Sequence, residues 1–205
     1  MEIKISKQKI PYKTAINFLK KRVENIKAGT SRDLLWILEH PTTYTAGIRS
    51  NKNEILDKKI KVISTNRGGK ITLHNPGQKI VYFAIDLNKK KKDIRKLIDV
   101  IEKSIIEFLK IYKIKGRNDK KNIGIWVGNR KIGAIGVRVS KWVAYHGCSI
   151  NVKNDLSKYQ KIIPCGLDNR KITSIYNEKK NTIKNTIKNI NKNLITIFKK
   201  NLNKI

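Results

Sequence analysis

The sequence predicts an α+β fold in which a mixed, mostly antiparallel sheet packs against helices. Two observations support this prediction. Short apolar segments typical of strands recur up to residue 152, and longer segments with apolar residues at helical spacing lie between and after them. No repeat and no linker rich in proline, glycine or serine divides the 205 residues. We therefore expect a single domain over residues 1–205.

Strands are expected where a short apolar segment is bounded by polar or turn-forming residues. These segments are residues 2–6, 34–38, 62–63, 71–73, 79–87, 122–127, 130–139 and 142–152. Residues 34–38 are apolar at every position, which predicts a buried strand. Gly128-Asn129 is a two-residue hairpin signal, whereas the polar residues 40–54 are expected to form a loop.

Helices are expected over residues 11–27, 93–112 and 178–202, where apolar residues recur every three or four positions. Asp93 can cap the second helix. The expected buried faces are Tyr12, Ala15, Ile16, Leu19, Val23 and Ile26; then Ile94, Leu97, Ile98, Ile101, Ile105, Phe108, Leu109 and Tyr112; and finally Ile183, Ile187, Ile190, Leu194, Ile197, Phe198 and Leu202.

The net charge of +32 is the most pronounced feature of the composition. Nucleic-acid binding is one interpretation, because lysine and arginine neutralise phosphates. However, 38 lysines stand against 9 arginines and are spread along the chain, which favours the coding bias of an A+T-rich genome. Nucleic acid is therefore an unfavoured partner, although a basic surface would still attract acidic proteins.

The chain is expected to be cytoplasmic. No apolar run approaches the ~20 residues that span a bilayer, so we expect no membrane association. The N-terminus lacks the apolar centre of a secretory signal, and two cysteines do not make a disulfide framework. No spacing of cysteine and histidine predicts a metal site.

Cys165 and Lys131 are the candidate catalytic residues. Cys165 lies in an Ile-Ile-Pro-Cys-Gly-Leu turn that can present its thiol, and backbone amides at 165–167 are candidate oxyanion donors. A thiol near pKa ~8.5 needs a nearby cation or base to react as thiolate. Lys131 opens a strand on the same face as apolar residues, so we expect it to be partly buried. The alternatives are an inert buried cysteine and a solvated lysine.

Two glycine-containing segments are candidate binding elements. Residues 67–78 contain a Gly-Gly pair and His74, which is a possible acid or base that only His40 and His146 could join. Residues 142–152 contain small residues at 147–149 that can line a slot for a narrow apolar ligand. The alternatives are an ordinary turn and a core strand with a glycine bulge.

Taken in order, these segments resemble the lipoyl(octanoyl) transferase family. The resemblance covers roughly residues 34–178 and is carried by HPTTYTAG at 40–47, RGGKITLHNPGQ at 67–78, KIGAIG at 131–136, YHGCSINV at 145–152, PCGL at 164–167 and ITSI at 172–175. Asn75 stands where the family usually has glycine, and Cys148 where a larger apolar residue is common. Asn tolerates positive φ, so the first departure leaves the turn possible.

The resemblance implies the fold of biotin and lipoate protein ligases and a transfer of octanoyl groups without a cofactor. The octanoyl chain would pass from acyl carrier protein to Cys165 as a thioester, with Lys131 activating the thiol. It would then pass to a lysine of a lipoyl domain, in 2-oxoacid dehydrogenases or the glycine cleavage H protein. The segments that would cradle the acyl substrate are Arg67, Gly68, Gly69, Lys70, Ile71, Thr72, Leu73, His74, Ala134, Ile135, Gly136, Gly147, Cys148 and Ser149.

Two other functions remain open at this point. An ATP-dependent lipoate or biotin ligase has the same fold but needs no nucleophilic cysteine. A lysine-rich nucleic-acid-binding protein would bind DNA or RNA in a salt-dependent way and would ignore Cys165.

Overall fold

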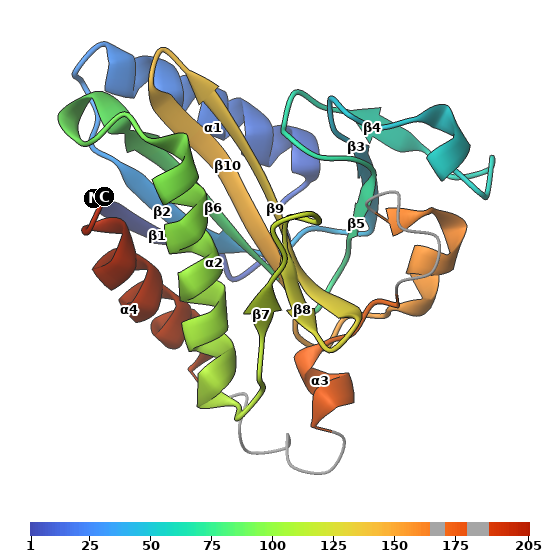
Figure 1. Cartoon of the computed structure of the whole chain (residues 1–205). Coiled ribbons are helices and arrows are strands. Elements are labelled where there is room, and N and C mark those ends of the chain that lie inside the picture. Colours follow the sequence, from blue (N-terminus) through green and yellow to red (C-terminus); the bar gives the residue numbers. More distant parts are fainter. Residues whose placement is uncertain (165–170, 180–188) are drawn as a thin grey trace.

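A seven-stranded sheet forms the centre of the computed structural model, which describes residues 1–164, 171–179 and 189–205. The strands follow the order β1 (Glu2–Ile5), β2 (Leu34–Leu38), β6 (Gln78–Asp86), β10 (Val143–Asn151), β9 (Arg130–Ser140), β8 (Ile125–Val127) and β7 (Arg117–Asn118). β1 and β2 run parallel, and the other neighbouring pairs of this sheet are antiparallel. The predicted mixed, mostly antiparallel sheet is confirmed (Figure 1).

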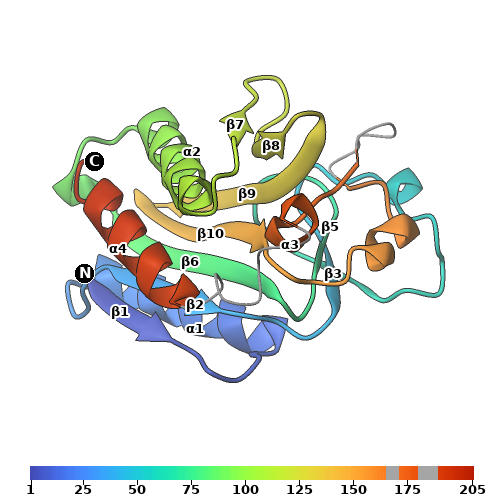
Figure 2. The ribbon, with the colours of Figure 1, turned by 90° about the horizontal axis from the view of Figure 1, so that it is seen from below.

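Helices cover both faces of this sheet (Figure 2). α1 (Tyr12–Lys27) packs on one face, and all six residues of its predicted apolar stripe are buried. α2 (Ile94–Ile111) and α4 (Ile190–Leu202) pack on the other face. The predicted cap is confirmed, because Asp93 accepts the backbone N–H of Lys96 at 2.9 Å. None of the described helices combines the length and the apolar character that a membrane span requires.

The apolar stripe of α2 is only partly buried at its N-terminal end. Leu97, Ile101 and Ile105 are fully buried under the sheet, as predicted. Ile94 is 42% exposed and Ile98 is half-buried, because the first turn of α2 extends beyond the core. The stripe therefore supplies apolar surface outside the core at its N-terminal end.

A second, three-stranded sheet has the order β4 (Val62–Ser64), β3 (Thr43–Ala46), β5 (Thr72–His74). The prediction of a loop over 40–54 is wrong for β3 and for a short 3₁₀ segment, η1 (Lys52–Glu54). Threonines made this segment look like a loop, but β3 pairs with β4 and β5, and these partners are distant in sequence. Two further 3₁₀ segments, η2 (Leu87–Lys89) and η3 (Ser157–Lys161), were not predicted.

The C-terminal helix is shorter than predicted. Glu178 ends a separate short helix, α3 (Ile175–Glu178), and Asn189 adopts a left-handed conformation, with φ of 71°, immediately before α4. The predicted helix over 178–202 is therefore confirmed only for 190–202. Residues 180–188, with Ile183 and Ile187 of the predicted stripe, lie outside the described residues.

Candidate functional site

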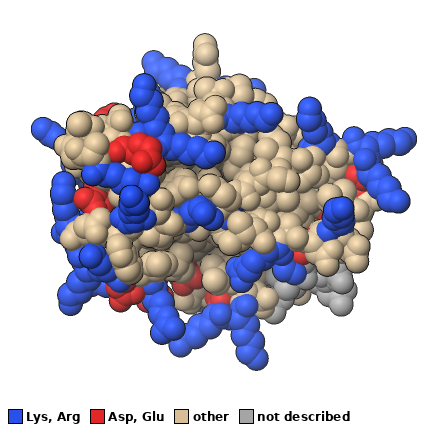
Figure 3. Space-filling view, turned by 90° about the horizontal axis from the view of Figure 1, so that it is seen from above, with Lys and Arg blue, Asp and Glu red and all other residues tan. Residues whose placement is uncertain are grey.

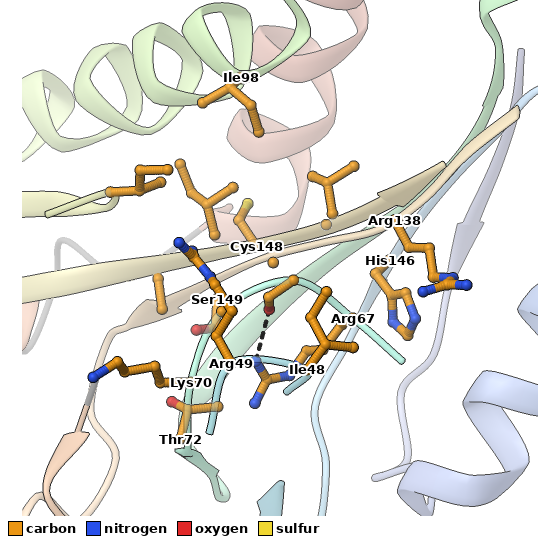
Figure 4. A pocket seen from close by; sticks show the side chains of 18 of the residues that line it. Ile48, Arg49, Arg67, Lys70, Thr72, Ile98, Arg138, His146, Cys148 and Ser149 are labelled. Atoms are coloured by element: carbon orange, nitrogen blue, oxygen red, sulfur yellow. Dashed lines mark hydrogen bonds between the residues drawn. The ribbon is translucent and has the colours of Figure 1, made fainter. Parts of the chain in front are cut away.

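A pocket of about 790 Å³ lies where β9 and β10 meet the small sheet and the first turn of α2. Figure 4 shows Ile98 of α2 on one side of this space, Lys70 and Thr72 on the opposite side, and Cys148 and Ser149 of β10 between them. The structure brings together the three predicted substrate segments at 67–74, 134–136 and 147–149. All fourteen predicted residues except Ile71 and Leu73 line the pocket.

Ile71 and Leu73 point away from this pocket. They are 1% and 0% exposed and pack with Tyr44, Tyr159 and Ile162 in a separate apolar cluster. Strand alternation explains the difference, because Thr72 and His74 of β5 then face the pocket. The two residues support the small sheet and do not contact the space where a substrate would lie.

The loop at 66–69 rests directly on the edge of β9. The backbone N–H of Gly68 donates to the carbonyl of Val137 at 3.2 Å, and the Arg138 guanidinium donates to the carbonyl of Asn66 at 3.1 Å. A Cβ atom at Gly136 would lie 3.1 Å from the carbonyl oxygen of Gly68. Glycine at 136 therefore lets this loop approach β9 and close one wall of the pocket.

Arg67 holds the same loop from beneath. Its Nη2 donates to the carbonyl and the hydroxyl of Thr45, at 2.8 and 2.9 Å. Its Nη1 donates to the carbonyl of Gly68 at 3.0 Å, which is the dashed line at Arg67 in Figure 4. The side chain is buried. Arg67 thus fixes the position of the glycine pair relative to β3 as well as lining the pocket.

Three histidines are buried in this part of the molecule, and their burial keeps the imidazole rings neutral. Burial lowers the pKa of His40 to about 4 and those of His74 and His146 to about 3. The neutral ring of His40 donates from Nδ1 to the carbonyl of Ile10 at 2.6 Å and accepts at Nε2 from the Tyr82 hydroxyl at 2.9 Å. His74 and His146 also line the pocket. The described residues contain no group of three potential metal ligands.

Lys131 is buried at the start of β9, as expected from its apolar neighbours, and is only 6% exposed. Its Nζ donates to the carbonyl of Ile123 at 3.0 Å and lies 5.2 Å from the centre of the Trp126 ring. It lines both the large pocket and a small adjoining cavity. The side chain is thus held in one place beside the substrate-sized space.

The chain on both sides of residues 165–170 is anchored beside Lys131. The backbone of Lys131 bonds that of Lys171 and Thr173, each at 2.9 Å, and the N–H of Ile163 donates to the carbonyl of Glu54 at 2.8 Å. Pro164 lines the small cavity together with Lys131. Cys165 itself, with residues 166–170, lies outside the described residues.

Cys148 is the cysteine that the structure describes, and its thiol is buried. Burial raises its pKa, which keeps the sulfur as a neutral thiol. Cys148 is therefore an apolar wall residue of the pocket.

Several pocket residues had no signal in the sequence. They are Ile48, Arg49, Asn66, Ile80, Tyr82, Ile94, Ile98, Lys120, Lys121, Asn122, Ile123, Val137, Arg138 and Val139. They come from segments that the sequence predicts as loops, as the buried face of a helix or as core strands. Among the exposed isoleucines, only Ile48 breaks a pattern, because it stands in the polar segment 40–54, whereas Ile94 and Ile123 fit the apolar patterns of a predicted helix and a predicted strand.

The sequence matches a family model along most of its length. The model of the lipoyl protein ligase A/B catalytic domain matches residues 11–199. An octanoyltransferase of Bartonella bacilliformis is 42% identical over 189 residues, covering 85% of this chain and 78% of its own. An octanoyltransferase of Wolbachia sp. subsp. Brugia malayi is 42% identical over 176 residues, covering 83% and 86%.

Solved structures of ligases share the fold. A lipoate-protein ligase A bound with ATP superposes with a TM-score of 0.74 at 16% identity, covering 99% of this chain and 86% of its own. A biotin protein ligase from Aquifex aeolicus superposes with a TM-score of 0.54 at 15% identity, covering 85% and 62%. The predicted biotin/lipoate protein ligase-like fold is confirmed.

Proposed function

Because this chain belongs to the lipoyl protein ligase A/B catalytic domain family, we propose that residues 1–205 form one catalytic domain that transfers octanoyl groups to lipoyl domains. The relatives that share about 40% of its sequence carry the name octanoyltransferase. The donor is octanoyl-acyl carrier protein, and the acceptors are lipoyl domains of 2-oxoacid dehydrogenases and the glycine cleavage H protein. The reaction takes place in the cytoplasm.

Cys165 is the nucleophile in this proposal. The single observation that carries it is the position of Lys131, whose buried side chain belongs to a residue that lines the same small cavity as Pro164, the residue bonded to Cys165. A lysine beside a thiol promotes the thiolate, either by its charge or by accepting the proton. Lys131 therefore activates Cys165.

The reaction has two steps. The Cys165 thiolate attacks the carbonyl carbon of the octanoyl thioester, the bond to the phosphopantetheine sulfur breaks, and the released thiolate takes up the proton lost by Cys165. The acceptor amine then attacks the Cys165 thioester, a C–N bond forms and the C–S bond breaks. The amine proton passes through Lys131 to the Cys165 sulfur.

The large pocket is the site for the octanoyl chain. Its volume of about 790 Å³ lies within the range of small-molecule sites. Ile98, Ile135, Val137 and Val139 supply apolar wall, and Cys148 adds a buried thiol beside them. The loop at 66–69 lines the same pocket and adds polar backbone groups to the wall that it forms with β9.

Mass spectrometry tests this function directly. The protein is incubated with octanoyl-acyl carrier protein, and we expect a mass increase of one octanoyl group that hydroxylamine removes. Cys165→Ala should give no adduct, and Lys131→Ala should form it more slowly by at least about a hundredfold, as is typical for a lost acid–base group. An unchanged mass of the unmodified protein would contradict the proposal.

The same samples separate the alternatives. A ligase would modify a lipoyl domain from free octanoate and ATP, and the Cys165→Ala protein would remain active. A nucleic-acid-binding protein would give no adduct and would bind DNA in a strongly salt-dependent manner.

A further inference from the structure

Three of the exposed large hydrophobic side chains in the described residues line the mouth of the octanoyl pocket. Ile48 is 64% exposed, Ile94 is 42% exposed and Ile123 is 44% exposed. They come from the loop after β3, the first turn of α2 and the loop between β7 and β8. Single exposed isoleucines need no explanation, but three converging from distant segments indicate a surface that is covered in use.

Cations accompany these isoleucines. Arg49, Lys120 and Lys121 are exposed pocket residues that pair with no carboxylate among the described residues. No Asp or Glu is among the described residues that line the pocket. The carboxylate of the nearby Asp119 accepts the backbone N–H groups of Lys121 and Asn122, at 2.9 and 3.1 Å, which shapes the loop. Figure 3 shows one face of the molecule, on which Lys and Arg project around most of the outline and Asp and Glu are few.

This surface adjoins the proposed reacting centre. The carbonyl of Ile123 accepts the hydrogen bond from Lys131 Nζ at 3.0 Å, so one residue belongs both to the mouth and to the environment of Lys131. An acyl chain that is still bonded to its carrier protein must enter this mouth with its free end first. The carrier protein then has to rest against the rim while the thioester reaches Lys131.

We propose that the rim formed by Ile48, Arg49, Ile94, Lys120, Lys121 and Ile123 is the docking surface for the acidic acyl carrier protein. The inference rests on the proposed function. The cations attract the carboxylates of the carrier and raise the rate of encounter, and the isoleucines bury apolar side chains of the carrier once it has docked. The rim contacts the protein part of the donor, while the pocket contacts the acyl chain.

The test compares a protein-bound donor with a small one. Formation of the octanoyl-enzyme is followed with octanoyl-acyl carrier protein and with octanoyl-pantetheine, which has neither protein nor phosphate. The variants are Lys120→Glu/Lys121→Glu and Ile48→Ser/Ile94→Ser. The matched control is Lys13→Glu/Lys21→Glu, which makes the same change of charge on the exposed face of α1, across the sheet from α2.

We expect the Lys120→Glu/Lys121→Glu variant to lose at least about tenfold in kcat/KM with the carrier protein, mainly through KM, and to lose far less with octanoyl-pantetheine. Its rate with the carrier should also respond less to added salt than that of the unmodified protein. The Ile48→Ser/Ile94→Ser variant should raise KM for the carrier alone. The control variant should remain close to the unmodified protein with both donors.

Four results would overturn the docking surface. The first is an equal loss of kcat/KM in the rim variants with both donors, and the second is an equal loss in the control variant. The third is the same loss with octanoyl-phosphopantetheine as with the carrier protein. The fourth is a loss confined to transfer from preformed octanoyl-enzyme to a lipoyl domain. The third would make the rim a phosphate site, and the fourth would make it the acceptor's surface. Failure of the unmodified protein to react with either donor would instead reject the proposed function.

Discussion

The Nζ of Lys131 lies 5.2 Å from the centre of the Trp126 ring, and that ring is fully buried. The indole N–H of Trp126 donates to the carbonyl of Asn122 at 3.0 Å, which fixes the ring. Together with the carbonyl of Ile123, the ring fixes the position of the Lys131 Nζ. A lysine side chain has four flexible bonds, so these contacts select one of its many conformations.

Replacing the ring should therefore slow the acylation of Cys165. We expect Trp126→Leu to reduce the rate by about tenfold, because a cation–π contact in a desolvated site contributes up to about 2 kcal/mol. Trp126→Phe keeps a ring and should lose less. The rate of octanoyl-enzyme formation at saturating donor measures this effect, and thermal unfolding shows the share of each protein that is folded. Equal rates for the Leu and Phe variants would mean that the ring does not position Lys131.

Gly124 should be intolerant of even one methyl group. Its φ is +141°, and a Cβ there would lie 2.5 Å from Cε and 2.9 Å from Nζ of Lys131, and 2.7 Å from the carbonyl oxygen of Gly133. We expect Gly124→Ala to push the lysine aside and to lower acylation by at least about tenfold, since misplacing a catalytic group by about 1 Å has large effects. Gly128→Ala, whose Cβ would meet nothing within 4 Å, is the control for left-handed backbone strain. Comparable losses in both variants would indicate strain and not displacement.

The two cysteines should differ sharply in reactivity. Burial raises the pKa of Cys148, so this thiol should resist iodoacetamide at pH 8 in the folded protein. We expect Cys148→Ala to retain the octanoyl adduct and Cys165→Ala to abolish it. Mass spectrometry of the alkylated and acylated peptides assigns each modification. An octanoyl group on Cys148 would contradict this assignment.

Acidification should destabilise the fold through its buried histidines. The folded-state pKa values of His40, His74 and His146 are about 4, 3 and 3, below the ordinary value of 6.5, so the unfolded chain binds protons first. Stability is therefore full above about pH 6.5 and declines as the pH falls toward 4. We expect urea denaturation to show a loss of at least about 1 kcal/mol between pH 7 and pH 5.

A substitution can assign part of this loss. His40→Gln can still donate to Ile10 and accept from Tyr82, but it does not titrate. The variant should lose less stability than the unmodified protein over the same pH interval. The same pH dependence in both proteins would show that His40 does not contribute.

Local patterns predicted much of the fold. The stripe of α1, the cap at Asp93 and the long strands β6, β9 and β10 follow from spacing and turn chemistry, which act over a few residues. β3 was missed because its pairing with β4 and β5 involves residues far along the chain. The predicted C-terminal helix begins too early, because the helical spacing of apolar residues in the sequence continues across Asn189, which is left-handed and precedes the first residue of α4.

For the site, the sequence by itself determined which residue types are present and in what order, and the resemblance assigned Cys165 and Lys131 their expected roles. Strand alternation also predicted that Lys131 would be partly buried, because it shares a strand face with apolar residues, although a solvated lysine stayed an alternative. Only the tertiary structure decided that Ile71 and Leu73 face away from the pocket, that Trp126 and Gly124 surround Lys131, and that isoleucines from three distant segments meet at one mouth. The physical reason is that periodicity assigns a side chain to one face of its own element, whereas packing between elements decides what that face meets.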